Sequence, residues 1–219
     1  MARRIIDLSF PIDGADPRGT VRLEPYKTFA EHRARITLVT FDTHSGTHLD
    51  APSHQLADAP TLDRMDLDRC VGPAEVIDCT AKGPYQMIDI ADLEAVAGRV
   101  RPGGRLLFRT DWSRRWGAPD FEEGYPAFTE AAAGWLAARG VVLVGIDTPS
   151  VAPCYRPIEV INAVHRPFLE AEVALVENLT NLAALRHPTV TFIALPLNLV
   201  GSDGCPVRAV AIEDASDGW

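Results

Sequence analysis

The chain has 219 residues and a formal net charge of −9, with 47% hydrophobic and 23% charged residues. These proportions are close to globular averages and exclude a disordered or collagen-like chain. A domain typically has about 150 residues, so we expect this chain to form one domain over residues 1–219. The acidic charge argues against nucleic acid as a partner, because such a surface must neutralise phosphates. No stretch reaches the ~18 consecutive apolar residues of a membrane span, so we expect no membrane partner.

The chain start and the cysteines indicate a cytoplasmic protein. Two arginines stand near the start of the chain, but Asp7 interrupts the apolar residues that follow Arg4. The apolar stretch of a secretory signal is therefore missing, and we expect no such signal. The four cysteines form no Cys-x-x-Cys pair, and a chain of this length folds without a disulfide framework. We therefore expect reduced, structural cysteines at Cys70, Cys79, Cys154 and Cys205.

The first half of the chain contains strand-like segments and one helix-like segment. β-branched residues favour a strand over 35–43. Shorter strands are expected over 74–78 and 105–109. Apolar residues at helical spacing predict a helix over 89–98.

The second half adds two helices and several strands. We expect a helix over 129–139, because Thr129 can cap its start and Gly140 follows its end. The apolar run over 141–147 is typical of a strand buried on both faces and covered by helices. A further helix is expected within 158–169, and strands are expected over 173–177, 190–197 and 207–212. Many strands with few helices predict an α/β fold, a single domain with a mixed β-sheet and flanking helices.

A cluster of histidines with an aspartate follows the strand predicted over 35–43. Three of the six histidines lie within eleven residues, at His44, His48 and His54, and Asp50 stands between the last two. Imidazole and carboxylate are the usual protein ligands of zinc, manganese or iron. Glycine and proline within the segment allow the chain to turn these side chains toward one point. The segment therefore predicts a metal site.

Two carboxylates elsewhere attract attention because they lie in apolar strands. Glu177 ends such a strand, and a buried carboxylate is costly unless an ion pair or a cation compensates it. Asp147 also follows an apolar strand. It is either a functional residue or a cap for the turn over 148–150.

The pattern His-x-Gly-Thr-His-x-Asp-x-Pro-x-His over 44–54 resembles the signature of the cyclase family of metal-dependent hydrolases, which includes bacterial kynurenine formamidases and isatin hydrolases. The segment Gly-Ile-Asp-Thr-Pro-Ser over 145–150 is similar to a second family segment. The segments 194–197 and 204–209 are similar to its C-terminal run. The resemblance thus covers nearly the whole chain.

This resemblance implies a fold, a ligand set and a catalytic residue. The fold would be the swivelling β/β/α type, and the protein would be a homodimer or homotetramer. His54 would donate and accept protons without binding metal. One or two divalent ions, zinc or manganese, would be held by His44, His48, Asp50, His165 and Glu177.

The implied activity is hydrolysis of a small amide by metal-activated water, with His54 as general acid and base. The substrate would be an N-formyl aromatic amine such as N-formylkynurenine, or a cyclic amide such as isatin. Two alternatives remain open: a lactone or cyclic imide hydrolase, and a non-catalytic metal-binding protein in which His54 is also a ligand. The region 16–22 lacks the tryptophan of the corresponding loop in kynurenine formamidases, so the substrate and the residues that bind it stay open.

Overall fold

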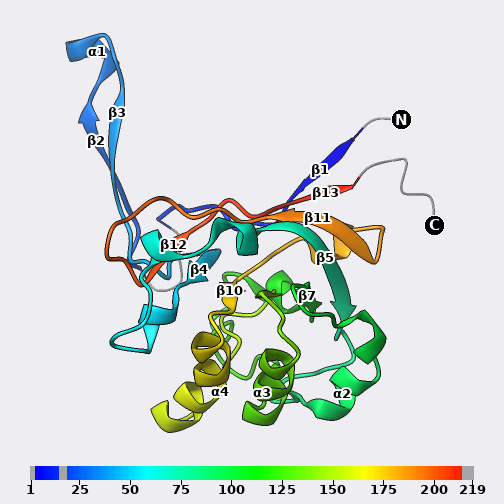
Figure 1. Ribbon diagram of the computed structural model, residues 1–219. Coiled ribbons are helices and arrows are strands. Elements are labelled where there is room, and N and C mark those ends of the chain that lie inside the picture. The colour runs from blue at the N-terminus through cyan, green and yellow to red at the C-terminus, as the bar shows by residue number, and fades with distance from the viewer. Residues whose placement is uncertain (1–2, 15–18, 214–219) are drawn as a thin grey trace.

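Nine strands form a mixed sheet at the centre of the protein, in the order β1-β13-β11-β5-β7-β9-β10-β4-β12 (Figure 1). The computed structural model describes residues 3–14 and 19–213, so part of the region 16–22 lies outside the described residues. Parallel pairing joins β5 (Val71–Asp78), β7 (Arg105–Arg109), β9 (Leu143–Ile146) and β10 (Ala174–Glu177). Antiparallel pairing adds β1 (Arg4–Asp7), β13 (Val210–Glu213), β11 (Thr189–Ile193), β4 (His48–Asp50) and β12 (Gly204–Pro206). The prediction of an α/β fold with a mixed sheet is confirmed.

Three helices cover one face of this sheet, namely α2 (Ile90–Glu94), α3 (Glu130–Ala138) and α4 (Ile158–Glu170) (Figure 1). Their apolar side chains, among them Leu136 and Phe168, pack with Phe108 and Ile146 of the strands. The short strands β6 (Met87–Ile88) and β8 (Ala127–Phe128) pair with each other. Single 3-10 turns cover Pro52–His54, Leu62–Arg64, Leu67–Cys70, Ala97–Arg99, Trp112–Arg115 and Leu182–Ala184.

On the opposite face of the sheet, residues from the two ends of the strand order pack against each other. A second apolar cluster joins Leu8, next to β1, with Leu49 of β4, although these strands lie near opposite ends of the strand order. Leu107 and Val176 of the central strands belong to the same cluster. The apolar strand β9 is buried at all four positions, as predicted, but helices cover only one of its faces.

Capping residues set the helix boundaries. The Thr129 side chain accepts a hydrogen bond of 3.1 Å from the amide of Ala132, and Gly140 has the positive φ of +70° that ends α3. The helix predicted over 89–98 is shorter, because α2 ends at Glu94 and a separate 3-10 turn follows. None of the helices in the described part of the chain has the length and hydrophobicity needed to span a bilayer.

A hairpin projects from the body of the protein (Figure 1). It consists of β2 (Arg22–Lys27), α1 (Phe29–His32) and β3 (Ile36–Thr40), and we call residues 22–40 the arm. The strand predicted over 35–43 therefore exists as β3, but it pairs only with β2, and all five of its residues are exposed. β-branched residues favour a strand whether or not its faces are buried, so the sequence does not distinguish these cases.

Candidate metal centre

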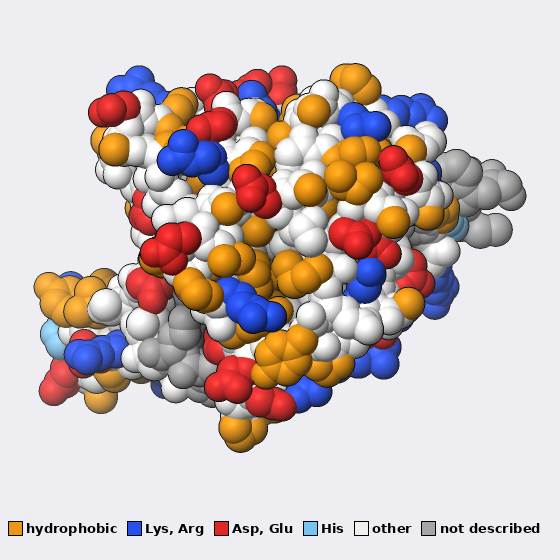
Figure 2. Space-filling view, turned by 90° about the horizontal axis from the view of Figure 1, so that it is seen from below, with side chains coloured by type: hydrophobic (Ala, Val, Ile, Leu, Met, Phe, Trp, Pro, Cys, Tyr) orange, Lys and Arg blue, Asp and Glu red, His pale blue; other side chains and the backbone are white. Residues whose placement is uncertain are grey.

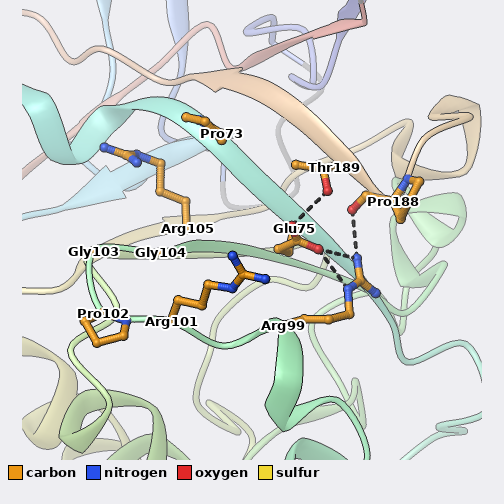
Figure 3. Close-up of a pocket in the computed structure, with 10 residues that line it drawn as sticks. All are labelled: Pro73, Glu75, Arg99, Arg101, Pro102, Gly103, Gly104, Arg105, Pro188 and Thr189. Carbon is orange, nitrogen blue, oxygen red and sulfur yellow. Dashed lines mark hydrogen bonds and ion pairs between the residues drawn. The ribbon is translucent and has the colours of Figure 1, made fainter. Parts of the chain in front are cut away.

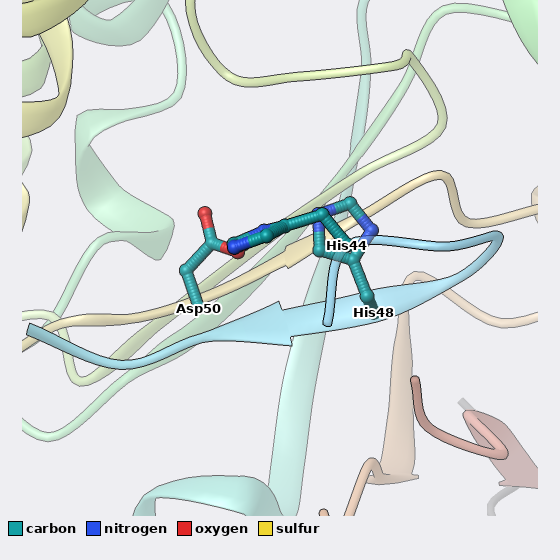
Figure 4. Close-up of side chains that lie close together, drawn as sticks. All are labelled: His44, His48 and Asp50. Carbon is teal, nitrogen blue, oxygen red and sulfur yellow. The ribbon is translucent and has the colours of Figure 1, made fainter. Parts of the chain in front are cut away.

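The strand β4 places two of the predicted ligands on the same side. His48 and Asp50 are two residues apart in a strand, so their side chains point in the same direction, and both are buried. His44 lies in the turn before β4 and directs its ring toward Asp50 (Figure 4). Its Nδ1 atom lies 2.9 Å from Asp50 Oδ1, and His48 Nε2 lies 3.4 Å from the same oxygen.

The neighbouring strand β10 and the helix α4 complete the cluster. Glu177 lies opposite His48 in the antiparallel pairing of β10 with β4, and Glu177 Oε2 is 3.4 Å from His48 Nε2. His165, on α4, is 1% exposed and brings Nε2 to 3.6 Å from Glu177 Oε1. The structure thus brings together all five side chains that the sequence predicts as metal ligands.

Each of the three histidines has one ring nitrogen beside an oxygen outside the cluster centre. The Nδ1 atoms of His48 and His165 lie 2.9 and 3.0 Å from backbone carbonyl oxygens. His44 Nε2 lies 2.9 Å from a carboxylate oxygen of Asp203. Metal-binding histidines are held in this way through the nitrogen that does not bind the metal. The other nitrogen of each ring faces the carboxylates of the cluster.

Asp50 contacts the ring nitrogens of the cluster and no other donor among the described residues. It is 1% exposed, with His44 Nδ1 at 2.9 Å and His48 Nε2 at 3.4 Å from its Oδ1 atom, and His165 Nε2 is likewise buried beside a carboxylate of the cluster. A buried carboxylate without compensation is strongly unfavourable. One ligand atom each from His44, His48 and Asp50 lies within 4.8 Å of the others. These nitrogen and oxygen donors therefore fit a divalent metal ion.

Charges and hydrogen bonds within the cluster shift the pKa values of two of its members, His44 and Glu177. Burial lowers the pKa of His44, but the hydrogen bonds and charges of Asp50 and Asp203 outweigh it and raise this pKa to about 9. Burial raises the pKa of Glu177, but His165 and His48 hold it well below its ordinary value. The Glu177 carboxylate therefore stays ionised and favours a cation beside it.

Glu177 is oriented by the segment that follows β9. Its Oε1 atom accepts hydrogen bonds of 2.8 Å from the Ser150 hydroxyl and 2.7 Å from the amide of Val151. The Ser150 hydroxyl is thus committed to holding a carboxylate. This leaves Glu177 Oε2 directed toward His48.

The Asp147 side chain bonds to the loop that follows β7. Its carboxylate accepts hydrogen bonds of 2.7 and 2.6 Å from the amide and hydroxyl of Thr110, and one of 2.8 Å from the amide of Asp111. It therefore anchors the loop after β7 and does not cap the turn over 148–150. Burial raises its pKa to about 6 despite these hydrogen bonds. The described residues that line the cavity beside the cluster do not include it.

His54 lies at the open side of the cluster. It ends the 3-10 turn after β4, and its side chain is 26% exposed. Its ring centre lies 4.1 Å from that of His44 and 5.9 Å from that of His165. A cavity of about 390 Å³ opens here, and its lining includes the rings of His44, His48, His54 and His165.

Asp203 is a site residue that the sequence reasoning missed. Its Oδ2 atom lies 2.9 Å from His44 Nε2 and 3.4 Å from His54 Nδ1, so one carboxylate contacts both rings. The pairing of β12 with β4 brings Gly204 opposite Asp50 and thereby carries Asp203 to the site. Its position directly before the segment 204–209, which resembles the family, is the signal that could have identified it.

A second cavity, of about 610 Å³, has a different character (Figure 3). Three arginines line it, but two of them are engaged within the protein. Arg99 pairs with Glu75 and donates to a backbone carbonyl, and Arg105 donates to two backbone carbonyls. These contacts join the sheet to the segments around it, and we assign no chemistry to this cavity.

Comparisons with known proteins agree with this geometry. Residues 6–153 match the family described as "Putative cyclase". The chain is 31% identical over 218 residues to a kynurenine formamidase of Bordetella petrii, covering 96% of this chain and 99% of that one. A kynurenine formamidase of Delftia acidovorans is 32% identical over 223 residues, covering 96% and 98%. Isatin hydrolase A from Ralstonia solanacearum has a TM-score of 0.85 and 26% identity, covering 97% of this chain and 92% of that one. The chain therefore belongs to the cyclase family, as the signature over 44–54 predicts.

Proposed function

We propose that the protein is a metal-dependent hydrolase that cleaves a small amide. The observation that carries the proposal is the buried Asp50 carboxylate, whose contacts among the described residues are the imidazole nitrogens of His44 and His48. Relatives named kynurenine formamidase and isatin hydrolase support an amide substrate. We propose an N-formyl aromatic amine such as N-formylkynurenine, or a cyclic amide such as isatin.

The ligands proposed for one ion are His44, His48 and Asp50. Asp50 would also reach a second ion, which His165 would hold, and Glu177 would contact both ions. Imidazole and carboxylate ligands suit both zinc and manganese. When bound, such an ion lowers the pKa of a water molecule toward neutrality and polarises the carbonyl of a substrate.

The protein's own groups would orient the reaction and move the proton. His54 is proposed to take a proton from the attacking water and return it to the leaving nitrogen, because it is partly exposed at the cavity. Asp203 Oδ2 lies 3.4 Å from the Nδ1 atom of His54. The Nε2 atom of the same ring would then be the one that exchanges protons with the substrate. Ser150 and Val151 would keep Glu177 in place, because the hydroxyl and the amide both donate to its Oε1 atom.

One observation favours the non-catalytic alternative. Ligand atoms of Asp50, His54 and His165 also lie within 4.8 Å of one another, so His54 is close enough to serve as a ligand. In that case the protein ligands would close the site to water, whereas a catalytic site keeps one position open. The exposure of His54 toward the cavity supports the catalytic interpretation.

The protein is first supplied with zinc or manganese, and its metal content is measured by elemental analysis. The same protein is then assayed with formamides, isatin, lactones and cyclic imides. We expect bound metal, and we expect turnover of an amide that chelation abolishes. Glu177→Gln should lose metal while the protein stays folded, because the amide keeps the hydrogen bonds from Ser150 and Val151. Glu170→Gln, an exposed carboxylate on α4, is the control. Metal-free wild-type protein with full activity would refute the proposal.

A homodimer or homotetramer and a cytoplasmic location are part of the same proposal. Thiols remain reduced in the cytoplasm, and the four cysteines are all free thiols.

A further inference from the structure

Gln55 lies in the wall of the metal-site cavity and has no part in the reaction proposed above. It lines this cavity of about 390 Å³ together with the histidine rings of the cluster. Gln55 directly follows His54, and its backbone amide donates to the carbonyl of Pro52 at the end of the 3-10 turn. The backbone that carries the Gln55 side chain is therefore fixed beside the residue proposed to move protons.

The amide oxygen of Gln55 is buried without a donor. Its Oε1 atom is shielded from solvent and has no hydrogen-bond partner among the described residues. The sequence contains one other glutamine, Gln86, whose Oε1 atom accepts a hydrogen bond of 2.8 Å from the amide of Gly83. A buried acceptor without a donor is unfavourable. A ligand that brings an N–H group to Gln55 would therefore be stabilised there.

The side chain of Gln55 can turn its oxygen toward the cavity. The residue as a whole is only partly buried. The torsion that rotates a terminal amide is broad and roughly two-fold, so both orientations are accessible. Because Oε1 has no partner among the described residues, this rotation breaks no hydrogen bond of the oxygen.

Selection of an uncharged substrate depends on the groups that line the cavity. Figure 2 views the molecule from the side of the helices and shows acidic and basic side chains interspersed there. A cleft attracts charged substrates when one sign of charge dominates around it. Within the lining, the Ser150 hydroxyl is engaged with Glu177, and the thiol of Cys154 is a weak hydrogen-bond partner. Gln55 offers an uncharged acceptor that has no such engagement.

We propose that Gln55 accepts a hydrogen bond from the N–H group of the substrate's amide. This contact would select secondary amides over N-substituted amides and lactones, which lack the N–H group. The inference rests on the proposed function and narrows its substrate class. It also gives the unpartnered Oε1 atom a donor in the complex.

The contact would orient the nitrogen that leaves. The oxygen of a water molecule adds to the carbonyl carbon, and His54 takes a proton from that water. The C–N bond then breaks, its electron pair goes to the nitrogen, and the nitrogen receives the proton from His54. The N–H bond that faces Gln55 stays intact throughout. Because Gln55 and His54 are adjacent, an N–H group held by Gln55 would leave the electron pair of the nitrogen turned toward His54.

Isatin and N-methylisatin test the contact, because they differ only in the N–H group and a ring fixes the amide geometry in both. The ratio of their kcat/KM values is divided by the ratio of their rates of hydrolysis by hydroxide in solution. We expect the wild type to favour isatin by about 10-fold or more in this corrected ratio. Gln55→Met keeps the length of the side chain but has no oxygen acceptor. It should bring the corrected ratio to within about 3-fold of one.

Two further variants separate the acceptor from other effects of the substitution. An ionised carboxylate accepts hydrogen bonds but donates none, so Gln55→Glu should keep the preference for isatin. Gln86→Met changes the glutamine that lies outside the cavity lining and should behave as the wild type. Metal content and circular dichroism should be the same in all of these proteins.

Equal corrected ratios in the wild type and in Gln55→Met would overturn the inference. Loss of the preference in Gln55→Glu would also overturn it, because Gln55 would then donate and not accept. If the wild type binds metal but hydrolyses none of the screened amides, the proposed function fails separately. Where isatin is not hydrolysed, calorimetric Kd values for the two compounds decide: tighter binding of isatin by the wild type, but not by Gln55→Met, supports the contact. Equal Kd values, or no binding of either compound, would overturn it.

Discussion

The Thr47 hydroxyl donates a hydrogen bond of 2.5 Å to the backbone carbonyl of Asn178 and thereby ties the ligand-bearing β4 to the end of β10. The same hydroxyl oxygen accepts a hydrogen bond of 2.9 Å from the amide of Phe10. Thr47 directly precedes His48, and Asn178 directly follows Glu177. The bond therefore holds the two sides of the metal cluster at a fixed separation.

Loss of this hydroxyl should loosen the cluster. Thr47→Val keeps the shape of the side chain but leaves the Phe10 amide and the Asn178 carbonyl buried without this partner. We expect a loss of about 1–3 kcal/mol in the free energy of unfolding of the metal-free protein. We also expect weaker metal binding. Urea denaturation and metal titration measure the two effects, and Thr47→Ser should restore both. Identical results for the valine and serine variants would show that the hydroxyl does not matter.

His54→Ala should retain the metal and lose turnover. A general acid–base group contributes about 10²- to 10⁴-fold in rate, and the ring lies at the open side of the cavity. Metal content and turnover should be measured on the same sample. A metal-free variant would instead identify His54 as a ligand and favour the closed, non-catalytic site.

Asp203→Asn should weaken metal binding although Asp203 is not among the proposed ligands. Its carboxylate lies 2.9 Å from His44 Nε2 and orients that ring. Groups that hold a ligand in this way typically contribute 10- to 100-fold in metal affinity. Competition with a chelator of known affinity measures the change. Wild-type affinity in the variant would show that His44 needs no such support.

Glu213 should make stability depend on acid pH. It is 5% exposed and accepts hydrogen bonds from the backbone amides of Arg186 and His187 and from the side chain of Arg4. Burial raises its pKa, but these amides and the charge of Arg4 outweigh burial and lower it below 4.5. The stabilisation is therefore complete above pH 4.5 and is lost as the pH falls through the lower, folded-state pKa.

Glu213→Gln tests this directly. The variant should be about 1–2 kcal/mol less stable than the wild type at pH 7, because the charge-assisted bonds are lost. The difference should shrink when unfolding is measured at pH values below 4.5. A difference that is constant with pH would assign the effect to packing and not to ionisation.

The sequence alone determined the features that depend on neighbouring residues. The helix α3 follows from the cap at Thr129 and the glycine at 140, whose effects act within one turn. The metal site at 44–54 follows from three histidines and Asp50 within eleven residues, whereas the strand β4, which gives His48 and Asp50 a common direction, was not predicted. The family resemblance added His165 and paired it with Glu177, a carboxylate already conspicuous in its apolar strand, because no local spacing predicts their proximity.

Only the tertiary structure decided the features that depend on pairing between distant segments. Asp203 reaches His44 because β12 pairs with β4, a register set by long-range packing. Asp147 bonds the loop after β7 because parallel pairing places the ends of β7 and β9 together. The arm shows the same limit, because a β-branched run such as 36–40 has the same strand preference in a core as in a projecting hairpin.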